Sequence, residues 1–179
     1  MKVTINNVRL SFPSLFELDK FKKYSGAFLI EPGQKGLAEL EAVCEEVGKA
    51  KWGAKWPAIK KELEAGGKML IQDGNKKASQ AGYEGMLYVN ASNSVRPLVL
   101  DRDKTPLAAG DGKPYAGCKV NAIIDVWAQD NNEFGKRLNG QLQGVQFVED
   151  GEAFGAGGKA ADVSDFDEIA DGADADDLA

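Results

Sequence analysis

The sequence predicts a mainly β fold: an antiparallel barrel of short strands with a helical insertion and a disordered acidic C-terminal tail. Three observations lead to this prediction. The 179 residues include 21 glycines and six prolines, which suit short strands joined by many turns better than a helical bundle. Apolar residues alternate with a period of two over most of the chain, and recur at three and four only between residues 35 and 65. From residue 160 onward the chain is almost entirely Ala, Asp, Gly and Glu.

Two strands are expected before the helical insertion. Residues 2–12 alternate in two stretches that fall out of step at Asn6-Asn7. Such a slip predicts a strand with a bulge or bend, a common device where barrels curve. Residues 24–31 predict a second strand, which ends at Pro32-Gly33.

Two helices follow these strands. Between residues 35 and 51 apolar residues recur at intervals of three and four, as in an amphipathic helix. A shorter helix over residues 57–65 begins with Pro57 in its first turn and stops at Gly66-Gly67. The apolar face of the first helix consists of Leu37, Leu40, Val43, Cys44 and Val47.

Strand patterns dominate the rest of the body. The clearest is residues 118–128, in which every second residue from Val120 to Val126 is apolar. Six or seven short strands with a local helical insertion fit an open or closed antiparallel barrel, and we expect the oligonucleotide-binding (OB) fold; a β-sandwich is the alternative. The expected strands of this region are 68–72, 83–91, 97–100, 118–128 and 137–148.

The charge is divided between two parts of the chain. Residues 149–179 hold eleven acidic residues against Lys159 alone, a net charge of −10. Residues 1–148 hold the other 21 basic and 17 acidic residues, a net charge of +4, so the whole chain carries −6. We therefore expect a mildly basic domain over 1–148 and a flexible acidic tail over 149–179, hinged at 155–158, because the tail lacks the apolar surface that would offset its ordering entropy.

Several classes of site are missing from the sequence. Without histidine, the chain can form no Ser-His-Asp triad, no HExxH motif and no Cys/His zinc site. It contains no P-loop and no Gly-x-Gly-x-x-Gly after a strand. We therefore expect no enzymatic activity, no cofactor and no metal.

The compartment is expected to be the cytoplasm. The first twelve residues lack the pattern of a secretion signal, and no stretch reaches 18 consecutive apolar residues. Cys44 and Cys118 are far apart in the sequence and without a second pair, so we expect them to be buried, reduced thiols.

Basic and aromatic residues alternate in the helical region, where Lys49, Lys51, Trp52, Lys55 and Trp56 lie close together. Single-stranded nucleic acid calls for this combination, because cations contact phosphates while aromatic rings stack on bases of any identity. The alternative is that the tryptophans pack the helices onto the barrel and that the lysines are only solvated.

Further candidates lie in the strand region. Lys76 and Lys77 occupy a turn before Tyr83, and Arg96 precedes the strand at residue 97. By strand parity, aromatic residues also fall on the polar faces of two strands, where a ring can stack on a base or pack under a loop. These are Tyr88 and, on the same face as Lys119, Trp127.

Short motifs follow one another in a fixed order through most of the body, at residues 7–13, 51–53, 73–74, 83–92, 96–97, 115–117 and 144–146. With these motifs and its acidic tail, the sequence resembles the single-stranded-DNA-binding proteins of tailed phages, long catalogued as a domain of unknown function. The resemblance implies an OB fold, binding of single strands without sequence preference, and a tail that interacts with replication or recombination proteins. The chain departs from many acidic-tailed binders because it ends in Asp177-Leu178-Ala179 and not in an aromatic residue, so Leu178 or Phe166 would have to serve instead.

These observations predict a phage protein that binds single-stranded DNA in replication or recombination, with a tail that competes with DNA and recruits partner proteins. Self-association is left open. The alternatives are a protein-interaction module or DNA-mimicking inhibitor that acts through the tail, and a metal-dependent nuclease. Phosphate contacts are expected from Lys49, Lys51, Lys55, Lys76, Lys77, Arg96 and Lys119; stacking is expected from Trp52, Tyr88 and Trp127, with Trp56 and Tyr83 in reserve.

Overall fold

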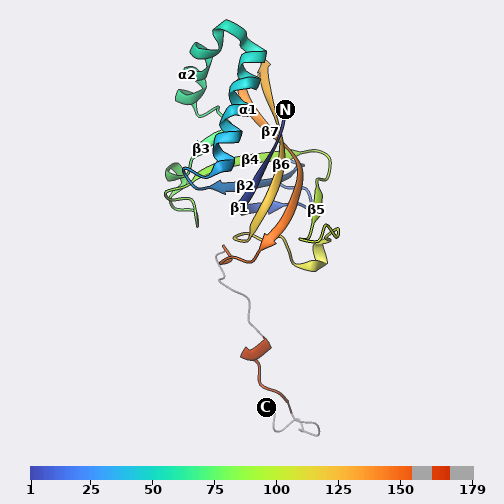
Figure 1. The fold of residues 1–179 in the computed structure, drawn as a ribbon. Coiled ribbons are helices and arrows are strands. Elements are labelled where there is room, and N and C mark those ends of the chain that lie inside the picture. Colours follow the sequence, from blue (N-terminus) through green and yellow to red (C-terminus); the bar gives the residue numbers. More distant parts are fainter. Residues whose placement is uncertain (155–162, 170–179) are drawn as a thin grey trace.

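A computed structural model describes residues 1–154 and 163–169. The helical insertion lies at one end of a strand-built body, and the chain leaves that body at the other end (Figure 1). The α-helices and strands are β1 (Lys2–Ser14), β2 (Tyr24–Ile30), α1 (Lys35–Trp52), α2 (Trp56–Gly66), β3 (Ile71–Asp73), β4 (Leu87–Asn93), β5 (Leu98–Leu100), β6 (Lys119–Asn131) and β7 (Gly135–Glu149). Four short 3-10 helices are η1 (Gly53–Lys55), η2 (Gly74–Lys77), η3 (Ala109–Asp111) and η4 (Val163–Asp165).

The strands form a closed barrel. In the order β4-β2-β1-β6-β7 each strand pairs antiparallel with the next, and β4 meets β7 in parallel at Ser92 and Gln141 to close the ring. Outside this ring, β3 pairs with β4, and β5 pairs in parallel with β7. The predicted antiparallel barrel is confirmed, and a two-sheet sandwich does not form.

The first strand bends where the sequence predicted a slip. The register of β1 against β6 shifts between Ile5 and Val8, and Asn7 there takes a left-handed backbone conformation, with φ of 57°. The Asn7 backbone N–H donates to Asn121 Oδ1 at 2.9 Å, which satisfies a donor that the bulge removes from the ladder. Residues on both sides of the bulge can therefore point into the core.

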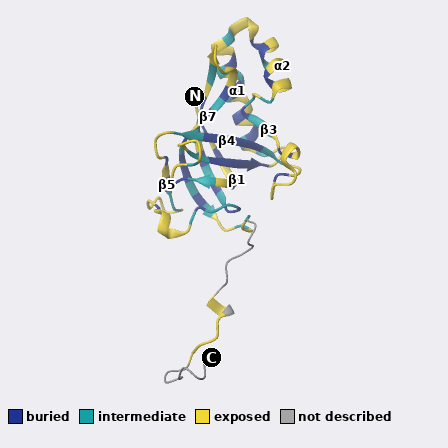
Figure 2. Cartoon of the chain, turned by 180° about the vertical axis from the view of Figure 1, so that it is seen from behind, coloured by how far each residue is buried: buried dark blue, intermediate teal, exposed yellow. Residues whose placement is uncertain are grey.

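The barrel interior is filled by the apolar faces of the strands, and Figure 2 shows the buried residues concentrated along them. The predicted apolar row of β6 lies inside the barrel, where it packs against the inner face of β7. All four residues of this row, Val120, Ala122, Ile124 and Val126, are buried.

Both predicted helices are present: α1 packs on β1 and β6, and α2 packs on α1. The buried face of α1 includes Leu37, Leu40 and Cys44, and that of α2 includes Ile59 and Leu63. Both cysteines are buried free thiols. Burial raises the pKa of Cys44 to about 12, so this thiol stays protonated and unreactive at neutral pH.

The largest difference from the predicted strand boundaries is at the start of β4. β4 begins at Leu87, whereas residues 83–86 form a turn in which the Met86 N–H donates to the Tyr83 carbonyl at 3.1 Å. The Gly74 N–H donates to the Met86 carbonyl at 2.8 Å and ties this turn to η2. Tyr83 therefore belongs to a loop, because the turn's own hydrogen bonds replace the strand ladder there.

Beyond β7 the structure describes two segments of the predicted tail. Residues 150–154 contact the barrel, as detailed below, and η4 forms one turn closed by the Phe166 N–H and the Val163 carbonyl at 3.2 Å. The expected hinge at 155–158 and the last ten residues lie outside the described residues. Within the described residues, no helix is long and apolar enough to cross a membrane.

Candidate nucleic-acid interface

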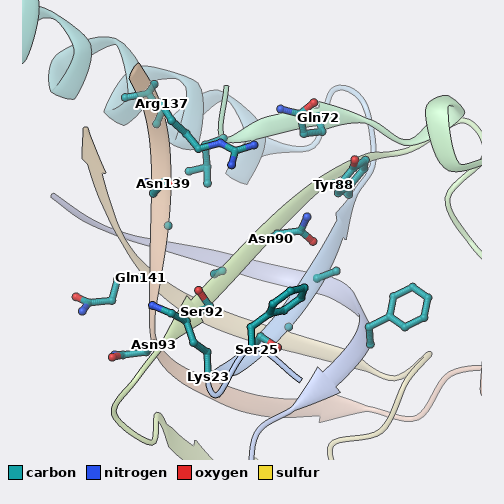
Figure 3. A pocket seen from close by; sticks show the side chains of 18 of the residues that line it. Lys23, Ser25, Gln72, Tyr88, Asn90, Ser92, Asn93, Arg137, Asn139 and Gln141 are labelled. Carbon is teal, nitrogen blue, oxygen red and sulfur yellow. The ribbon is translucent and has the colours of Figure 1, made fainter. Parts of the chain in front are cut away.

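A groove of about 1030 Å³ crosses the outer surface of the barrel over β2, β4, β7 and β6 (Figure 3). Strand parity explains its position, since Val89 of β4 points into the core whereas its neighbours Tyr88 and Asn90 point outward into the groove. The same alternation turns Arg137 and Asn139 of β7 toward it. We call this hollow the barrel groove.

Three exposed aromatic rings line the barrel groove. Phe12 lies at the end of β1, Phe21 in the loop before β2, and Trp127 on β6. Their exposed fractions are 59%, 72% and 47%, respectively. Large apolar rings left this exposed around a concave surface mark a binding site, and their faces can stack on unpaired bases.

Two buried tyrosines form a wall of the groove behind these rings. Tyr83 and Tyr88 meet edge-on with ring centroids 5.3 Å apart, and the Tyr83 centroid lies 6.3 Å from that of Phe12. The ammonium of Lys77 lies 4.9 Å from the centroid of the Tyr88 ring, a favourable cation–π distance. Burial raises the pKa of both phenols, so they remain neutral at physiological pH.

The groove carries three cations, Lys23, Lys77 and Arg137. Within the described parts of the chain, none of the three forms an ion pair with a carboxylate. Their charges are therefore available to an anionic ligand such as a phosphate backbone.

The two acidic residues of the groove are occupied by donors of the protein. Asp19 accepts hydrogen bonds from the Ser25 hydroxyl at 2.8 Å and from the backbone N–H groups of Phe21 and Lys23 at 2.8 and 3.1 Å. The hydrogen bond from Ser25 and these backbone donors lower the pKa of Asp19. This carboxylate thus shapes the loop that presents Phe21 and Lys23. Asp125 accepts from the N-terminal ammonium of Met1 at 2.5 Å.

Between the aromatic and cationic side chains the groove is lined by uncharged polar groups. Several are held in place: Asn139 Nδ2 donates to Gln129 Oε1 at 3.0 Å, and Asn93 Nδ2 donates to the Leu142 carbonyl at 2.9 Å. Amides and hydroxyls both donate and accept, so they can contact the edge of any base. The group includes Gln72, Asn90, Ser92, Asn93, Asn139 and Gln141.

Four of the twelve residues predicted to contact DNA line the barrel groove: Lys77, Tyr83, Tyr88 and Trp127. Lys77 lies in the predicted turn, and of the three aromatic residues only Trp127 is placed as the sequence suggested, as an exposed ring on the polar face of its strand. The two tyrosines differ from the prediction, because packing against each other leaves Tyr83 1% exposed and Tyr88 6% exposed. They form the wall of the groove and offer no open ring face.

The helical candidates lie apart from the groove. Trp52 and Trp56 stack on each other with centroids 5.7 Å apart, and Trp52 Nε1 donates to Asp130 of the β6–β7 hairpin at 2.9 Å. Trp56 is 2% exposed and donates to Glu45 at 2.8 Å, so the expectation that it contacts DNA is corrected: it packs α2 against α1. Lys49, Lys51 and Lys55 are exposed on the same insertion and do not line the groove.

The remaining predicted cations are also outside the barrel groove. Lys76 is exposed in η2 next to Lys77 but does not line the groove. The Arg96 guanidinium lies over the Phe16 ring, 5.3 Å from its centroid, and Lys119 pairs with Glu149 at 3.3 Å.

Sequence reasoning missed Phe12, Phe21, Lys23, Arg137 and Asn90. A signal for two of them was present, since Lys20-Phe21-Lys22-Lys23 repeats the alternation of lysine and aromatic residues that singled out residues 49–56. The parity that placed Tyr88 outward also placed Asn90 beside it. Phe12 and Arg137 carried no local signal, because only barrel closure brings their strands to one groove.

Comparisons with known proteins show the family and the fold of the chain. A family model described as the single-stranded-DNA-binding protein of Enterobacter phage Enc34 matches residues 1–178. Protein p50 of Acyrthosiphon pisum secondary endosymbiont phage 1 is 42% identical in an alignment that covers 94% of each chain.

Solved structures show the same fold. The single-stranded-DNA-binding protein of bacteriophage Enc34 in complex with single-stranded DNA is 26% identical, with a TM-score of 0.72 over 86% of this chain and 89% of that one. The same phage protein without DNA is 29% identical, with a TM-score of 0.69 over 92% and 88%. The single-stranded-DNA-binding protein gp2.5 of bacteriophage T7, 14% identical with a TM-score of 0.60 over 97% of each chain, shares the fold. The OB fold predicted from the sequence is confirmed.

Proposed function

Because the chain belongs to the family of the Enterobacter phage Enc34 single-stranded-DNA-binding protein, we propose that its barrel groove binds single-stranded DNA without preference for base sequence. One observation carries the proposal: a single concave surface gathers three exposed aromatic rings, three cations without ion-pair partners in the described chain, and a set of uncharged amides and hydroxyls.

Each class of side chain has a role in this binding. Bases stack on the exposed faces of Phe12, Phe21 and Trp127, and every base has a π-face, so stacking does not select a sequence. Lys23, Lys77 and Arg137 neutralise phosphates and release their counterions. The amides contact base edges in whichever donor and acceptor pattern they present. Duplex DNA is disfavoured because its bases are already paired and stacked.

Other predicted contacts remain part of the proposal as a second, outlying region. Lys49, Lys51, Trp52 and Lys55 lie on the helical insertion. The hydrogen bond from Trp52 to Asp130 ties that insertion to the end of the β6–β7 hairpin near Arg137. A strand that leaves the groove past Arg137 would reach these lysines. Lys76, Arg96 and Lys119 would attract the strand only at longer range.

We further propose that the protein covers single strands during phage DNA replication or recombination, in the cytoplasm of the host. The charge division supports a role for the acidic tail, since the body of +4 is tethered to a segment of −10. A tethered polyanion can occupy the phosphate-binding cations of its own body and can attract basic partner proteins.

The test of the proposed function is a titration of labelled oligonucleotides followed by fluorescence anisotropy. We expect oligo-dT, oligo-dC and mixed single strands of equal length to bind with affinities within about tenfold of one another, and duplex of that length to bind more weakly. The logarithm of the association constant should fall with the logarithm of salt concentration, with a slope of about −0.7 per phosphate neutralised. A preference for duplex, or affinity that does not respond to salt, would contradict the proposal.

A further inference from the structure

The chain does not leave the barrel where β7 ends. Residues 150–154, which we call the strap, run back along the loop that precedes β6. The Tyr115 hydroxyl donates to Asp150 Oδ1 at 2.7 Å, and the Phe154 N–H donates to the Ala116 carbonyl at 2.9 Å. Arg9 of β1 donates from Nη2 to the Glu152 carbonyl at 2.9 Å. The strap is therefore fixed to the barrel by residues from two separate regions, although the sequence placed it in the acidic tail.

Two glycines allow the strap to approach this closely. A Cβ on Gly117 would lie 2.1 Å from the Glu152 carbonyl oxygen, and one on Gly82 would lie 2.4 Å from Cζ of Phe154. Both glycines also have positive φ, +105° and +84°. Any other residue at either position would push the strap away from the barrel.

The Phe154 ring is the anchor of the strap. The Arg9 guanidinium lies 4.2 Å from its centroid on one side, and the ring packs against a small apolar cluster on the outer surface of the barrel. This cluster consists of Ala27, Leu29, Tyr83 and Tyr88. Three of its four residues, Ala27, Tyr83 and Tyr88, also line the barrel groove. One thin layer of side chains thus separates the strap from the groove.

Tyr83 links this layer to the stacking ring of Phe12. Its ring is 1% exposed and lies 6.3 Å from the Phe12 ring, and its side chain hydrogen-bonds that of Ser11, the residue before Phe12. Gly82, which contacts Phe154, directly precedes Tyr83. A side chain removed from behind Tyr83 would leave a cavity into which Tyr83 can shift, and Phe12 would lose its support.

We propose that Phe154 is a positioning residue of the barrel groove: it contacts no DNA, and it holds Tyr83, and through Tyr83 the Phe12 ring, where a base can stack. The inference rests on the proposed function of the groove. By this inference the strap belongs to the DNA-binding domain, and its main role is to support the barrel groove.

The test compares the full-length protein with Phe154→Ala. We expect Phe154→Ala to bind single-stranded DNA about tenfold more weakly, the equivalent of one misplaced stacking contact. Plots of the logarithm of affinity against that of salt concentration should be parallel, because no phosphate-binding cation is lost. A change in how the tail competes would alter the slope instead, since salt screens that competition. Glu152→Gln is the matched control: it removes a strap carboxylate, keeps the backbone carbonyl that Arg9 contacts, and should leave the slope and affinity nearly unchanged.

A double-mutant cycle with Phe12→Ala separates positioning from a general loss of stability. If Phe154 acts through Phe12, its replacement should cost much less affinity in the Phe12→Ala background than in the wild type. Phe154→Leu keeps most of the apolar volume and replaces Phe154→Ala in the cycle if the alanine variant is unfolded at the assay temperature. Full additivity, or wild-type affinity of a folded Phe154→Ala protein, would overturn the inference. If the wild type fails to bind single strands at all, it is the proposed function that fails.

Discussion

The Lys77 ammonium lies 4.9 Å from the centroid of the Tyr88 ring, so the turn of η2 and the strand β4 meet at the wall of the barrel groove. The two residues come from separate sequence patterns, a basic turn and an alternating strand. Their contact places a cation on the aromatic wall, inside the groove that we propose binds the phosphate backbone. The contribution of the groove cations to phosphate binding can be compared with that of the lysines on the helical insertion.

The first prediction concerns the source of phosphate contacts. Replacement of Lys23, Lys77 and Arg137 together by glutamine should reduce the salt slope by about 2, since each contact contributes about 0.7. Replacement of Lys49, Lys51 and Lys55 by glutamine removes the same charge from the helical insertion and should reduce the slope less. Titrations over a range of salt concentrations measure both. Equal reductions would show that the strand covers both regions, and a larger effect of the helical set would move the site away from the groove.

The second prediction concerns stacking. Trp127→Ala should lose about 1–3 kcal/mol of binding free energy and leave the melting temperature nearly unchanged, because the ring lies about half exposed on the outer face of β6. Phe134→Ala is the matched control, since it removes an exposed ring from the turn of the same hairpin, and Phe134 does not line the groove. Both variants are to be compared by titration and thermal denaturation. A loss of affinity of the same size in both would argue against stacking at Trp127.

The third prediction separates a core tryptophan from a binding one. Trp56→Ala should lower the free energy of unfolding by about 3–5 kcal/mol, because the ring is 2% exposed and packs between α1 and α2. Where the variant remains folded, its affinity for single strands should match that of the wild type. Denaturant unfolding and titration well below the melting temperature measure the two effects. Weak binding by a fully folded Trp56→Ala protein would contradict this assignment.

The fourth prediction concerns the tail and the position at which it is cut. A chain that ends at Phe154 keeps the strap, and at low salt it should bind single strands more tightly than the full chain if the acidic residues beyond compete for the groove. A chain that ends at Val148 lacks Asp150, Glu152 and Phe154 and should melt at a lower temperature. Anisotropy and thermal denaturation of the three proteins test this. Equal low-salt affinity of the full chain and the chain ending at Phe154 would exclude competition by the tail.

The fifth prediction concerns acid stability. The Glu45 carboxylate accepts hydrogen bonds from the Lys60 ammonium and from Trp56 Nε1, and these lower its pKa from the ordinary value of 4.5. Because the folded-state pKa is the lower one, the stabilisation is fully present above pH 4.5 and is lost as the pH falls through the folded-state value. Glu45→Gln should therefore cost stability near neutral pH, by about 1 kcal/mol or less since the group is partly exposed, and the difference should vanish in acid. Denaturant unfolding across this pH range measures it, and a difference independent of pH would refute a role for the charge.

The order of the elements and the barrel interior could be predicted from the sequence, because both depend on local periodicity. The alternation in residues 118–128 reports a strand with one buried face, and the slip at Asn6-Asn7 reports a bulge, with no knowledge of the partner strand. The helices at 35–52 and 56–66 follow from spacing and from the residues at their ends. The division of charge between the body and the tail could also be predicted, because it depends only on the amino-acid composition of each part.

The groove depended on contacts between segments that are distant in the sequence. Pairing of β4 with β7 at Ser92 and Gln141 brings Asn90 and Asn139 to one surface, and no pattern within either strand encodes that closure. The burial of individual side chains also depended on contacts between distant segments. Trp52 and Trp56 have the same lysine-rich surroundings in the sequence, yet only Trp56 is fully enclosed between the helices. The position of Phe154 shows most directly why the sequence alone could not predict these contacts. Composition placed it in an acidic tail, but a ring finds its lowest free energy where apolar surface and an arginine are available, and only the folded barrel creates that place.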